Sequence, residues 1–372
     1  MLLLSGLVNS LSCRAGASEL AVTFFDIGQG DSTLIVSPTG KRVLIDGGPP
    51  EAGERLVGYL AARRISSIDL VILTHPHADH LGGLKRVVGA VPIKMFIDAA
   101  YPSNSPGYTG LLNALSMRGV VVKQATAGRQ MDLGGGALLT FLGPPTPWLT
   151  HTRSDINANS VVARLTWQNR TALFTGDSEP ETERWLLAQK DRGAGVLRAE
   201  LLKVAHHGGR FSSTTAFLQA VAPRIAVISV GTGNDYGHPT PEALARLTEV
   251  GARVLRTDLS GEVTVRSRDG QPWTVQPARS GSSPQVAHGA GEGDGERSSP
   301  AGPTAAAPPA ATPASAGTAA GSVYYVASTR SQVFHRSDCG GGLRIAPANL
   351  LRFATREAAL ASGRRPAEDC DP

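Results

Sequence analysis

The chain has 372 residues, and its 36 Lys and Arg residues against 31 Asp and Glu residues give a formal net charge of +5 at pH 7. Hydrophobic residues make up 41% of the chain and charged residues 18%, which allows a sizeable core and excludes a wholly disordered protein. The 3 cysteines are too few for a disulfide-held scaffold, and the mild positive charge permits a polyanionic partner without requiring one.

Residues 1–19 open with an apolar stretch, MLLLSGLVNSL, followed by small residues. This order resembles the end of a secretory signal peptide, so we expect an exported protein that acts outside the cytoplasm. The first basic residue is Arg14, so the charged segment that opens such a peptide is missing, and an ordered first strand is the alternative interpretation. Later in the chain no apolar run reaches the roughly 18 residues of a transmembrane helix, so no membrane-spanning bundle is expected.

Between residues 20 and 277, runs rich in apolar and β-branched residues alternate with helical patterns. The expected strands are 21–28, 32–38, 42–48, 69–75, 94–100, 137–144, 160–168, 171–177, 200–208, 225–231 and 252–258. The expected helices are 52–64, 106–118, 180–190, 213–221 and 241–250. Pro180 and Pro241 stand where a proline opens a helix. This mixed order predicts an α/β sandwich for residues 20–277.

The composition changes after this domain. Residues 278–322 are mostly Ala, Pro, Gly, Ser and Thr, which cannot bury enough apolar surface to offset chain entropy. We therefore expect a flexible linker there. Residues 323–372 resume with a strand pattern, VYYVAS, and a helical pattern, TREAALASG, which predict a small α+β module.

Four metal-ligand side chains follow the apolar strand DLVIL within six residues: His75, His77, Asp79 and His80. Residues two apart point the same way, so His75 and His77 can share one ion, while Asp79 and His80 emerge on the next turn and can serve a second. A solvated polar turn rarely collects so many ligand-type residues behind a buried strand. The pattern therefore predicts a site for two adjacent divalent metal ions.

Further ligand candidates stand at the ends of other expected strands. Asp177, in TGD, offers a carboxylate suited to bridging two cations, and the histidine pair His206 and His207 follows the strand ELLKVA. Asp46, in IDGG, could hold the second N–H of a ligand histidine. Each of these short motifs is common alone, and an aspartate that caps a turn is the plain alternative.

The motifs HxHxDH, TGD and the later histidine together resemble the metallo-β-lactamase-fold hydrolases, which implies an αββα sandwich. FDIGQGDS at 25–32, KVAHHG at 203–208, NDYGHP at 234–239 and LRTD at 255–258 narrow the resemblance to the ComEC-like branch. ComEC proteins are DNA-uptake channel proteins whose hydrolase domain is thought to degrade the strand that is not transported. The resemblance covers about residues 20–270 and omits the channel, so we expect a stand-alone relative.

Carried onto this chain, the resemblance implies that His75 and His77 bind one metal ion and that Asp79 and His80 bind the other. Asp177 would bridge the ions and His206 would be the last ligand, with His207 behind it or facing substrate. Many members of the superfamily have a further histidine before the bridging aspartate, but this chain has DINANS at 155–160, which includes Asn159 and leaves the first metal one nitrogen short. Without thiolate ligands, both zinc and manganese suit the site.

The mechanism expected from this resemblance is attack on phosphorus by a hydroxide shared between the two ions. His238, in a Gly-His-Pro turn, would stabilise the leaving oxygen, and Lys203 would neutralise phosphate. The alternatives are a loop histidine held by backbone and a lysine at a strand end. Asp26 and Asp31 flank the turn Gly28-Gln29-Gly30, and Asp31 is expected to orient the metal cluster or to cap that turn.

The C-terminal module resembles the small zinc domain first known from the Ada repair protein. The resemblance implies that His335, Cys339 and Cys370 are metal ligands, whereas Ala367 stands where a third ligand cysteine belongs. A Cys339–Cys370 disulfide is the rival interpretation in an exported protein. The module would serve as an accessory domain that binds DNA or a surface, or as an inert appendage.

The function expected from these observations is that of a metal-dependent phosphodiesterase or nuclease acting on DNA. The alternatives are hydrolysis of a small phosphodiester or another ester or amide substrate, such as a β-lactam or a thioester, and metal-free polyanion binding. Aromatic residues make up 5% of the chain, so recognition of a particular base sequence is not expected. The sequence leaves the oligomeric state open.

Overall fold

The computed structural model describes residues 18–189, 196–279, 324–329, 331–336, 345 and 349–367. The chain divides into two compact units, Met1–Pro284 and Gln285–Pro372. The expected leader (1–19) and linker (278–322) lie outside the described residues except for two residues each. Among the described residues, no helix is both long and apolar enough to cross a membrane.

One sheet of the first unit has eight strands in the order β15-β14-β1-β2-β3-β4-β5-β6. Its strands are β1 (Glu19–Phe24), β2 (Thr33–Val36), β3 (Arg42–Ile45), β4 (Leu70–Leu73), β5 (Met95–Asp98), β6 (Val121–Gln124), β14 (Val263–Arg268) and β15 (Thr274–Pro277). Strands β3 to β6 run parallel, with pairs such as Leu44 with Val71 and Ile72 with Ile97. The remaining neighbours pair antiparallel.

The second sheet has seven strands in the order β13-β12-β11-β10-β9-β8-β7. Its strands are β7 (Gln130–Gly134), β8 (Ala137–Phe141), β9 (Ala163–Trp167), β10 (Arg170–Phe174), β11 (Leu201–Lys203), β12 (Ile225–Ile228) and β13 (Arg253–Arg256). Here β10 to β13 are parallel to one another. Each sheet therefore has a parallel half, in which several strands end at the same edge.

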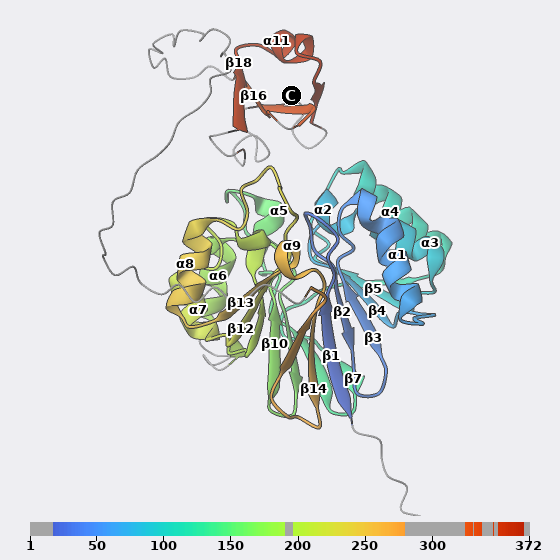
Figure 1. The fold of residues 1–372 in the computed structure, drawn as a ribbon. Helices are drawn as coiled ribbons and strands as arrows, with labels where there is room; N and C mark the ends of the chain where they lie inside the picture. Colours follow the sequence, from blue (N-terminus) through green and yellow to red (C-terminus); the bar gives the residue numbers. More distant parts are fainter. Residues whose placement is uncertain are drawn as a thin grey trace, which may run out of the picture. The chain divides into compact units, whose positions relative to one another are not determined.

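Helices cover the outer faces of both sheets (Figure 1). Helices α1 (Gly53–Ala62), α3 (Leu84–Ala90) and α4 (Pro106–Met117) pack on the first sheet, and α6 (Pro180–Ala188), α7 (Thr215–Val221) and α8 (Pro241–Glu249) pack on the second. Between the sheets lies a core that includes the fully buried Phe24, Phe141 and Trp167. The result is the αββα sandwich that the family resemblance implied.

Short helical turns lie in the loops at the ends of the strands: η1 (Pro50–Ala52), α2 (Ala78–Leu81), α5 (Asp155–Ala158), η4 (Ala205–Gly208) and α9 (Thr257–Ser260). Pro180 and Pro241 do open their helices, as expected. Strands β6, β7, β14 and β15 and helix α3 were not predicted. In β6 the sequence VVKQ is largely exposed, and β15 is an edge strand with the polar sequence TVQP, so neither has the apolar run by which the other strands are recognised.

The second unit contains a four-stranded sheet in the order β18-β16-β17-β19 and one described helix. Its elements are β16 (Tyr325–Ser328), β17 (Val333–Arg336), β18 (Leu350–Phe353), α11 (Arg356–Ala361) and β19 (Arg365–Pro366). Ala327, Phe334 and Ala359 form its core. His335 lies on β17, whereas Cys339 and Cys370 lie outside the described residues, so the zinc and disulfide interpretations both remain predictions.

Candidate metal centre

The ends of parallel strands carry the polar side chains of the site. Asp46 directly follows β3 and His75 closely follows β4, while Asp177 comes after β10 and the pair His206 and His207 comes after β11. Parallel neighbours end at the same edge of a sheet, and in α/β folds that carboxyl edge is where ligands bind. The two sheets thus each contribute part of one cluster.

Asp46 organises the part that comes from the first sheet. Its backbone is left-handed, with a φ of 59°, and its carboxylate accepts hydrogen bonds from the backbone N–H of Thr74 at 2.7 Å and from the Thr74 hydroxyl at 2.8 Å. The same carboxylate lies 2.9 Å from Nδ1 of His80. This contact leaves Nε2 of His80 directed at Asp177, which is the orienting role that the sequence suggested for Asp46.

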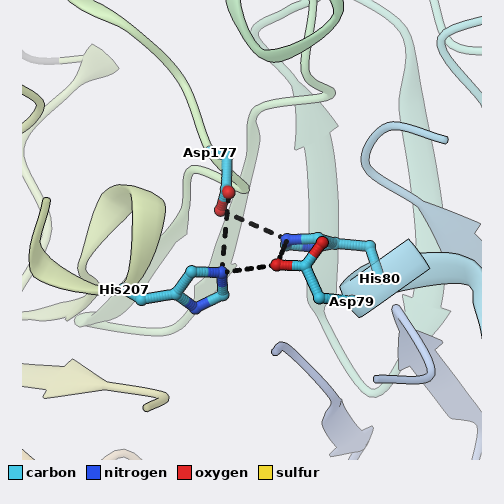
Figure 2. A group of neighbouring side chains, drawn as sticks. All are labelled: Asp79, His80, Asp177 and His207. Atoms are coloured by element: carbon cyan, nitrogen blue, oxygen red, sulfur yellow. Dashed lines mark hydrogen bonds and ion pairs between the residues drawn. The ribbon is translucent and has the colours of Figure 1, made fainter. Parts of the chain in front are cut away.

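Asp79, His80, Asp177 and His207 each offer one ligand atom within 4.8 Å of the others, and Figure 2 shows how they converge. Nε2 of His80 lies 3.3 Å from Oδ1 of Asp177, and Nε2 of His207 lies 3.1 Å from Asp79 and 3.5 Å from Oδ2 of Asp177. Three of the four are buried, and the partly exposed Asp79 marks the side that faces solvent.

The buried atoms of this cluster have the character of metal ligands. Nε2 of His80 and Oδ1 of Asp177 face each other as an ion pair at 3.3 Å without hydrogen-bond geometry, although both residues are at most 2% exposed. Buried polar atoms that lack a hydrogen bond are costly, and a cation between these two would satisfy both. The donor set of imidazole nitrogen and carboxylate oxygen, without sulfur, fits a divalent metal ion such as zinc or manganese.

His75, His77 and His206 lie beside this group. Nε2 of His75 is 3.1 Å from Nδ1 of His77 and 4.0 Å from Oδ2 of Asp177. Nε2 of His206 is 3.7 Å from the same oxygen of Asp177, and Nδ1 of His206 is 3.1 Å from Glu179. Asp177 thus has imidazoles on both of its carboxylate oxygens, as a bridging carboxylate would.

The two histidines of the pair contact different partners. His207, expected behind His206 or facing substrate, lies 3.1 Å from Asp79, whereas His206, expected as the last metal ligand, contacts Asp177 and Glu179. Both residues have left-handed backbones, with φ values of 50° and 54°. The sequence contains no signal for two consecutive left-handed residues that are not glycine, so the order could not be read from it.

Lys203 is buried rather than exposed to substrate. Its ammonium lies 2.6 Å from Asp31 and donates a hydrogen bond to the carbonyl of Val204, and the residue is only 2% exposed. The other oxygen of Asp31 lies 3.3 Å from Nδ1 of His207. Lys203 thus contacts Asp31, which in turn contacts His207, while the expected phosphate contact of Lys203 and the expected orienting role of Asp31 stay predictions.

Gly30 allows Asp31 to approach the metal-ligand turn. Its φ is +146°, and a Cβ atom on it would lie 2.3 Å from the carbonyl oxygen of Asp79. The backbone N–H of Asp31 donates to that same oxygen at 3.1 Å. The glycine turn of the GQGD motif thus joins two segments of the site by direct backbone contact.

Two expected residues do not reach the cluster. The carboxylate of Asp26 pairs with Arg279 at 3.0 Å, and the side chain of Asn159 bonds to the backbone of Leu149 and Asp155, which holds the loop before α5 in place. His238 lies at the edge of the cluster, with its ring 5.7 Å from that of His206.

Sequence reasoning missed three residues that orient the histidines. Ser229 places its backbone carbonyl 2.9 Å from Nδ1 of His207, Glu179 contacts His206, and Thr74 contacts Asp46. Glu179 directly precedes Pro180 at the start of α6, where an acidic residue is ordinary, so its second role carried no distinct signal.

The charges of the cluster are strongly coupled. Burial would raise the pKa of Asp177, yet the surrounding His207, His80 and His206 hold that pKa well below its usual range. Burial would lower the pKa of His207, yet Asp177 and Asp31 raise it to about 10. Burial, together with the neighbouring histidines, holds the pKa of His75 well below its usual value. A neutral imidazole such as that of His75 can bind a metal ion directly.

Residues 25–232 match the family described as the metallo-beta-lactamase superfamily, and the match covers more than half of the chain. The chain belongs to the metallo-beta-lactamase superfamily. Competence protein ComA of Neisseria gonorrhoeae is 32% identical over 262 residues, which are 70% of this chain and 34% of that protein. ComE operon protein 3 of Bacillus subtilis is 30% identical over 272 residues, which are 68% of this chain and 34% of that protein.

These relatives confirm the expected relation to competence proteins of the ComEC kind, and the chain spans about a third of their length. Among solved structures, the metallo-beta-lactamase fold protein YhfI from Bacillus subtilis aligns over 67% of this chain and 100% of its own. Its sequence identity is 16% and its TM-score is 0.44.

Proposed function

We propose that this superfamily member is a metal-dependent phosphodiesterase that cleaves DNA. The observation that carries the proposal is the Asp177 carboxylate, which is 2% exposed and lies between imidazoles from both sheets. An arrangement of this kind, closed by the partly exposed Asp79 on the solvent side, suits two metal ions that share one carboxylate.

The residues that would hold the ions are His75 and His77 on one side and Asp79, His80 and His207 on the other, with Asp177 between them. When bound, divalent ions polarise a phosphoryl oxygen and lower the pKa of water to about 7. The chain's own part is orientation: Asp46 holds the ring of His80, while Asp31 and the carbonyl of Ser229 hold that of His207. His238, whose ring centroid lies 5.7 Å from that of His206, would donate a proton to a leaving oxygen.

The surface beside His238 supports a nucleic-acid substrate. Tyr236 is 43% exposed and stacks on His238 with ring centroids 5.8 Å apart. Phe211, in the loop after the histidine pair, is 47% exposed, and the guanidinium of Arg153 lies 3.2 Å from its ring centroid. Exposed aromatic rings next to cations suit the bases and phosphates of a strand. Competence protein ComA of Neisseria gonorrhoeae and Recombination protein 2 of Haemophilus influenzae, the latter at 29% identity, support DNA as the substrate through the processes that they are named for.

The test is hydrolysis of single- and double-stranded DNA by metal-stripped protein to which zinc, manganese or magnesium is returned. We expect cleavage to return with at least one metal and to be lost in Asp79→Asn. Turnover of bis-p-nitrophenyl phosphate without DNA cleavage would support a phosphodiesterase and contradict DNA as its substrate. DNA binding that survives Asp79→Asn, with no hydrolysis by the wild-type protein, would contradict the proposal and favour a binding module.

A further inference from the structure

Two loops at the edge of the metal centre each present one exposed aromatic ring. Phe211, 47% exposed, lies in the loop that follows β11 and the histidine pair, and Tyr236, 43% exposed, lies in the loop that follows β12. Strands β11 and β12 are parallel neighbours, so both loops leave the second sheet at the same edge. A single exposed ring is ordinary on a protein surface, and these two differ from that case in how firmly their loops are held.

Two charged side chains fix the loop of Phe211. The guanidinium of Arg246 donates hydrogen bonds at 2.8 Å to three backbone carbonyls of this loop, those of Arg210, Ser212 and Ser213. The Glu183 carboxylate accepts the backbone N–H groups of Ser213 and Thr214 and also the hydroxyl of Thr214. The two residues after Phe211 are each 1% exposed. The ring is thus held outside the core by a backbone that is itself firmly anchored.

One side-chain amide fixes the loop of Tyr236. The carbonyl oxygen of Asn234 accepts the backbone N–H groups of Tyr236 and His238, at 3.2 and 3.0 Å. Its N–H₂ group donates to the backbone carbonyls of Gly231 and His238. The rings of Tyr236 and His238 stack, with planes 24° apart, and the ring centroid of His238 lies 5.7 Å from that of His206. This stack connects the exposed ring of Tyr236 to the candidate metal centre.

The two loops are joined to each other, and one ring lies beside a positive charge. The backbone N–H of Thr240 donates to the carbonyl of Gly208 at 2.9 Å, and the Thr240 hydroxyl donates to the same oxygen at 3.2 Å. Arg153, in the loop before α5, is exposed, and its guanidinium lies 3.2 Å from the ring centroid of Phe211. An exposed ring with an arginine beside it can bind the base and the phosphate of a nucleotide together.

We propose that Phe211 and Tyr236 select single-stranded DNA by stacking on its bases. Glu183, Arg246 and Asn234 are the positioning residues of the two rings. In a duplex both faces of each base are covered by neighbouring bases, so a protein ring reaches a base face only at an end, whereas an unpaired strand can turn its bases outward. Every base has a π face, so this selection does not depend on sequence. The inference rests on the proposed function for DNA as the substrate and adds the form in which the site takes it.

The experiment measures how tightly the full chain binds fluorescein-labelled single-stranded DNA and blunt duplex DNA of the same sequence. Binding is followed by fluorescence anisotropy in the presence of a chelator, so that neither form is cleaved. Phe211→Ala removes the ring and Phe211→Tyr restores one, while Val122→Ala truncates a 45% exposed residue on β6 as the matched control. A single strand that contains 5-bromodeoxyuridine crosslinks under ultraviolet light to a ring in contact with it, and peptide mass spectrometry locates the crosslink.

We expect the wild-type protein and Val122→Ala to bind the single strand more tightly than the duplex. In Phe211→Ala the single strand should bind about 5- to 150-fold more weakly, and the duplex should lose less. Phe211→Tyr should regain most of that loss, and the crosslink should map to Phe211 or Tyr236. Equal losses for both forms, no loss, or a crosslink outside both loops would overturn the inference.

The positioning residues have a test of their own. Arg246→Gln keeps the ring of Phe211 but removes the guanidinium that holds its loop, so it should lower the preference for the single strand by a smaller factor than Phe211→Ala does. Because the readout is the ratio of two affinities, a general loss of folded protein would not change it. An unchanged ratio would contradict the positioning role of Arg246.

The remaining outcomes separate this inference from the proposed function. Binding of the single strand that depends on Phe211, in a protein that cleaves no DNA with any metal, would support the inference and contradict the proposed function. Cleavage of both forms at equal rates, with the same rates in Phe211→Ala, would support the proposed function and overturn the inference.

Discussion

Replacing Asp46 with asparagine should misdirect His80 without removing any metal ligand. One carboxylate oxygen accepts the backbone N–H of Thr74 at 2.7 Å, and the other accepts the Thr74 hydroxyl and faces Nδ1 of His80 at 2.9 Å. In Asp46→Asn the amide oxygen must keep the hydrogen bond from the backbone N–H of Thr74, because that donor cannot rotate. The amide N–H₂ then faces Nδ1 of His80, which must accept a hydrogen bond from it.

The consequence is a change of tautomer. The proton of a neutral His80 moves from Nδ1 to Nε2, which is the atom 3.3 Å from Asp177 that would bind the metal. Loss of an orienting partner costs about 10- to 100-fold in metal affinity, which corresponds to about 1.4 to 2.7 kcal/mol. We therefore expect one ion of Asp46→Asn to bind weaker by that factor, as measured by chelator competition.

The matched control is Asp98→Asn. Asp98 ends β5, a parallel strand two places from β3 in the same sheet, and it is likewise buried and accepts hydrogen bonds from Tyr108 and the backbone N–H of Ala100. It contacts none of the histidines of the cluster. Burial would lower the pKa of His80, yet Asp177, Asp79 and Asp46 hold that pKa well above its usual value, so nitrogen-15 NMR of the metal-free variants reads the tautomer at a pH high enough to deprotonate the ring. Wild-type metal affinity in Asp46→Asn, or an equal loss in Asp98→Asn, would refute the reasoning.

Three further predictions concern stability. Lys203→Met removes the buried ammonium 2.6 Å from Asp31 and should lower the free energy of unfolding by about 3–5 kcal/mol in urea titrations. Lys94→Met removes a 70% exposed ammonium that pairs with Asp69, and it should change the free energy of unfolding by less than about 1 kcal/mol. Burial raises the pKa of Glu183 from 4.5 to about 7, so the folded state binds this proton more tightly than the unfolded state does. The resulting stabilisation of about 3 kcal/mol is complete below pH 4.5 and is lost as the pH rises to about 7. Glu183→Gln should remove that fall from the pH profile of unfolding, and an unchanged profile would exclude Glu183 as its source. Metal removal by a chelator should lower the melting temperature, since an ion present at about 100 times its Kd contributes about 2.7 kcal/mol, and identical melting with and without metal would contradict a metal site in the folded core.

The strands that carry the site could be predicted because each is an apolar run that stops at a polar residue. This pattern identifies β3, β4, β10 and β11. The polar residue that ends each run also places a site side chain at the edge of a sheet: Asp46, His75, Asp177 and the histidine pair. Strand β7, with the sequence QMDLG, lies at a sheet edge and lacks such a run. Helix α3, which follows the metal-ligand turn after two residues, was not among the expected helices.

The site itself was predictable in composition and only partly in geometry. Residue types and spacing indicated which side chains gather, but the order of His206 and His207 depends on two backbone φ angles that no pattern specifies. Similarly, a lysine at a strand end can extend to solvent or turn inward. Lys203 turns inward because Asp31, brought close by Gly30, offers a buried counter-charge.

The cluster draws its side chains from both sheets, and neither sheet holds a complete set. His75 to His80 follow β4 of the first sheet. Asp177 follows β10 of the second sheet, almost a hundred residues later, and the histidine pair follows β11 of the same sheet. A folding intermediate with only one sheet formed would present a fragment of the site with low affinity for metal. Capture of the ions should therefore come late in folding, and bound ions would link the two sheets at the edge where their parallel strands end.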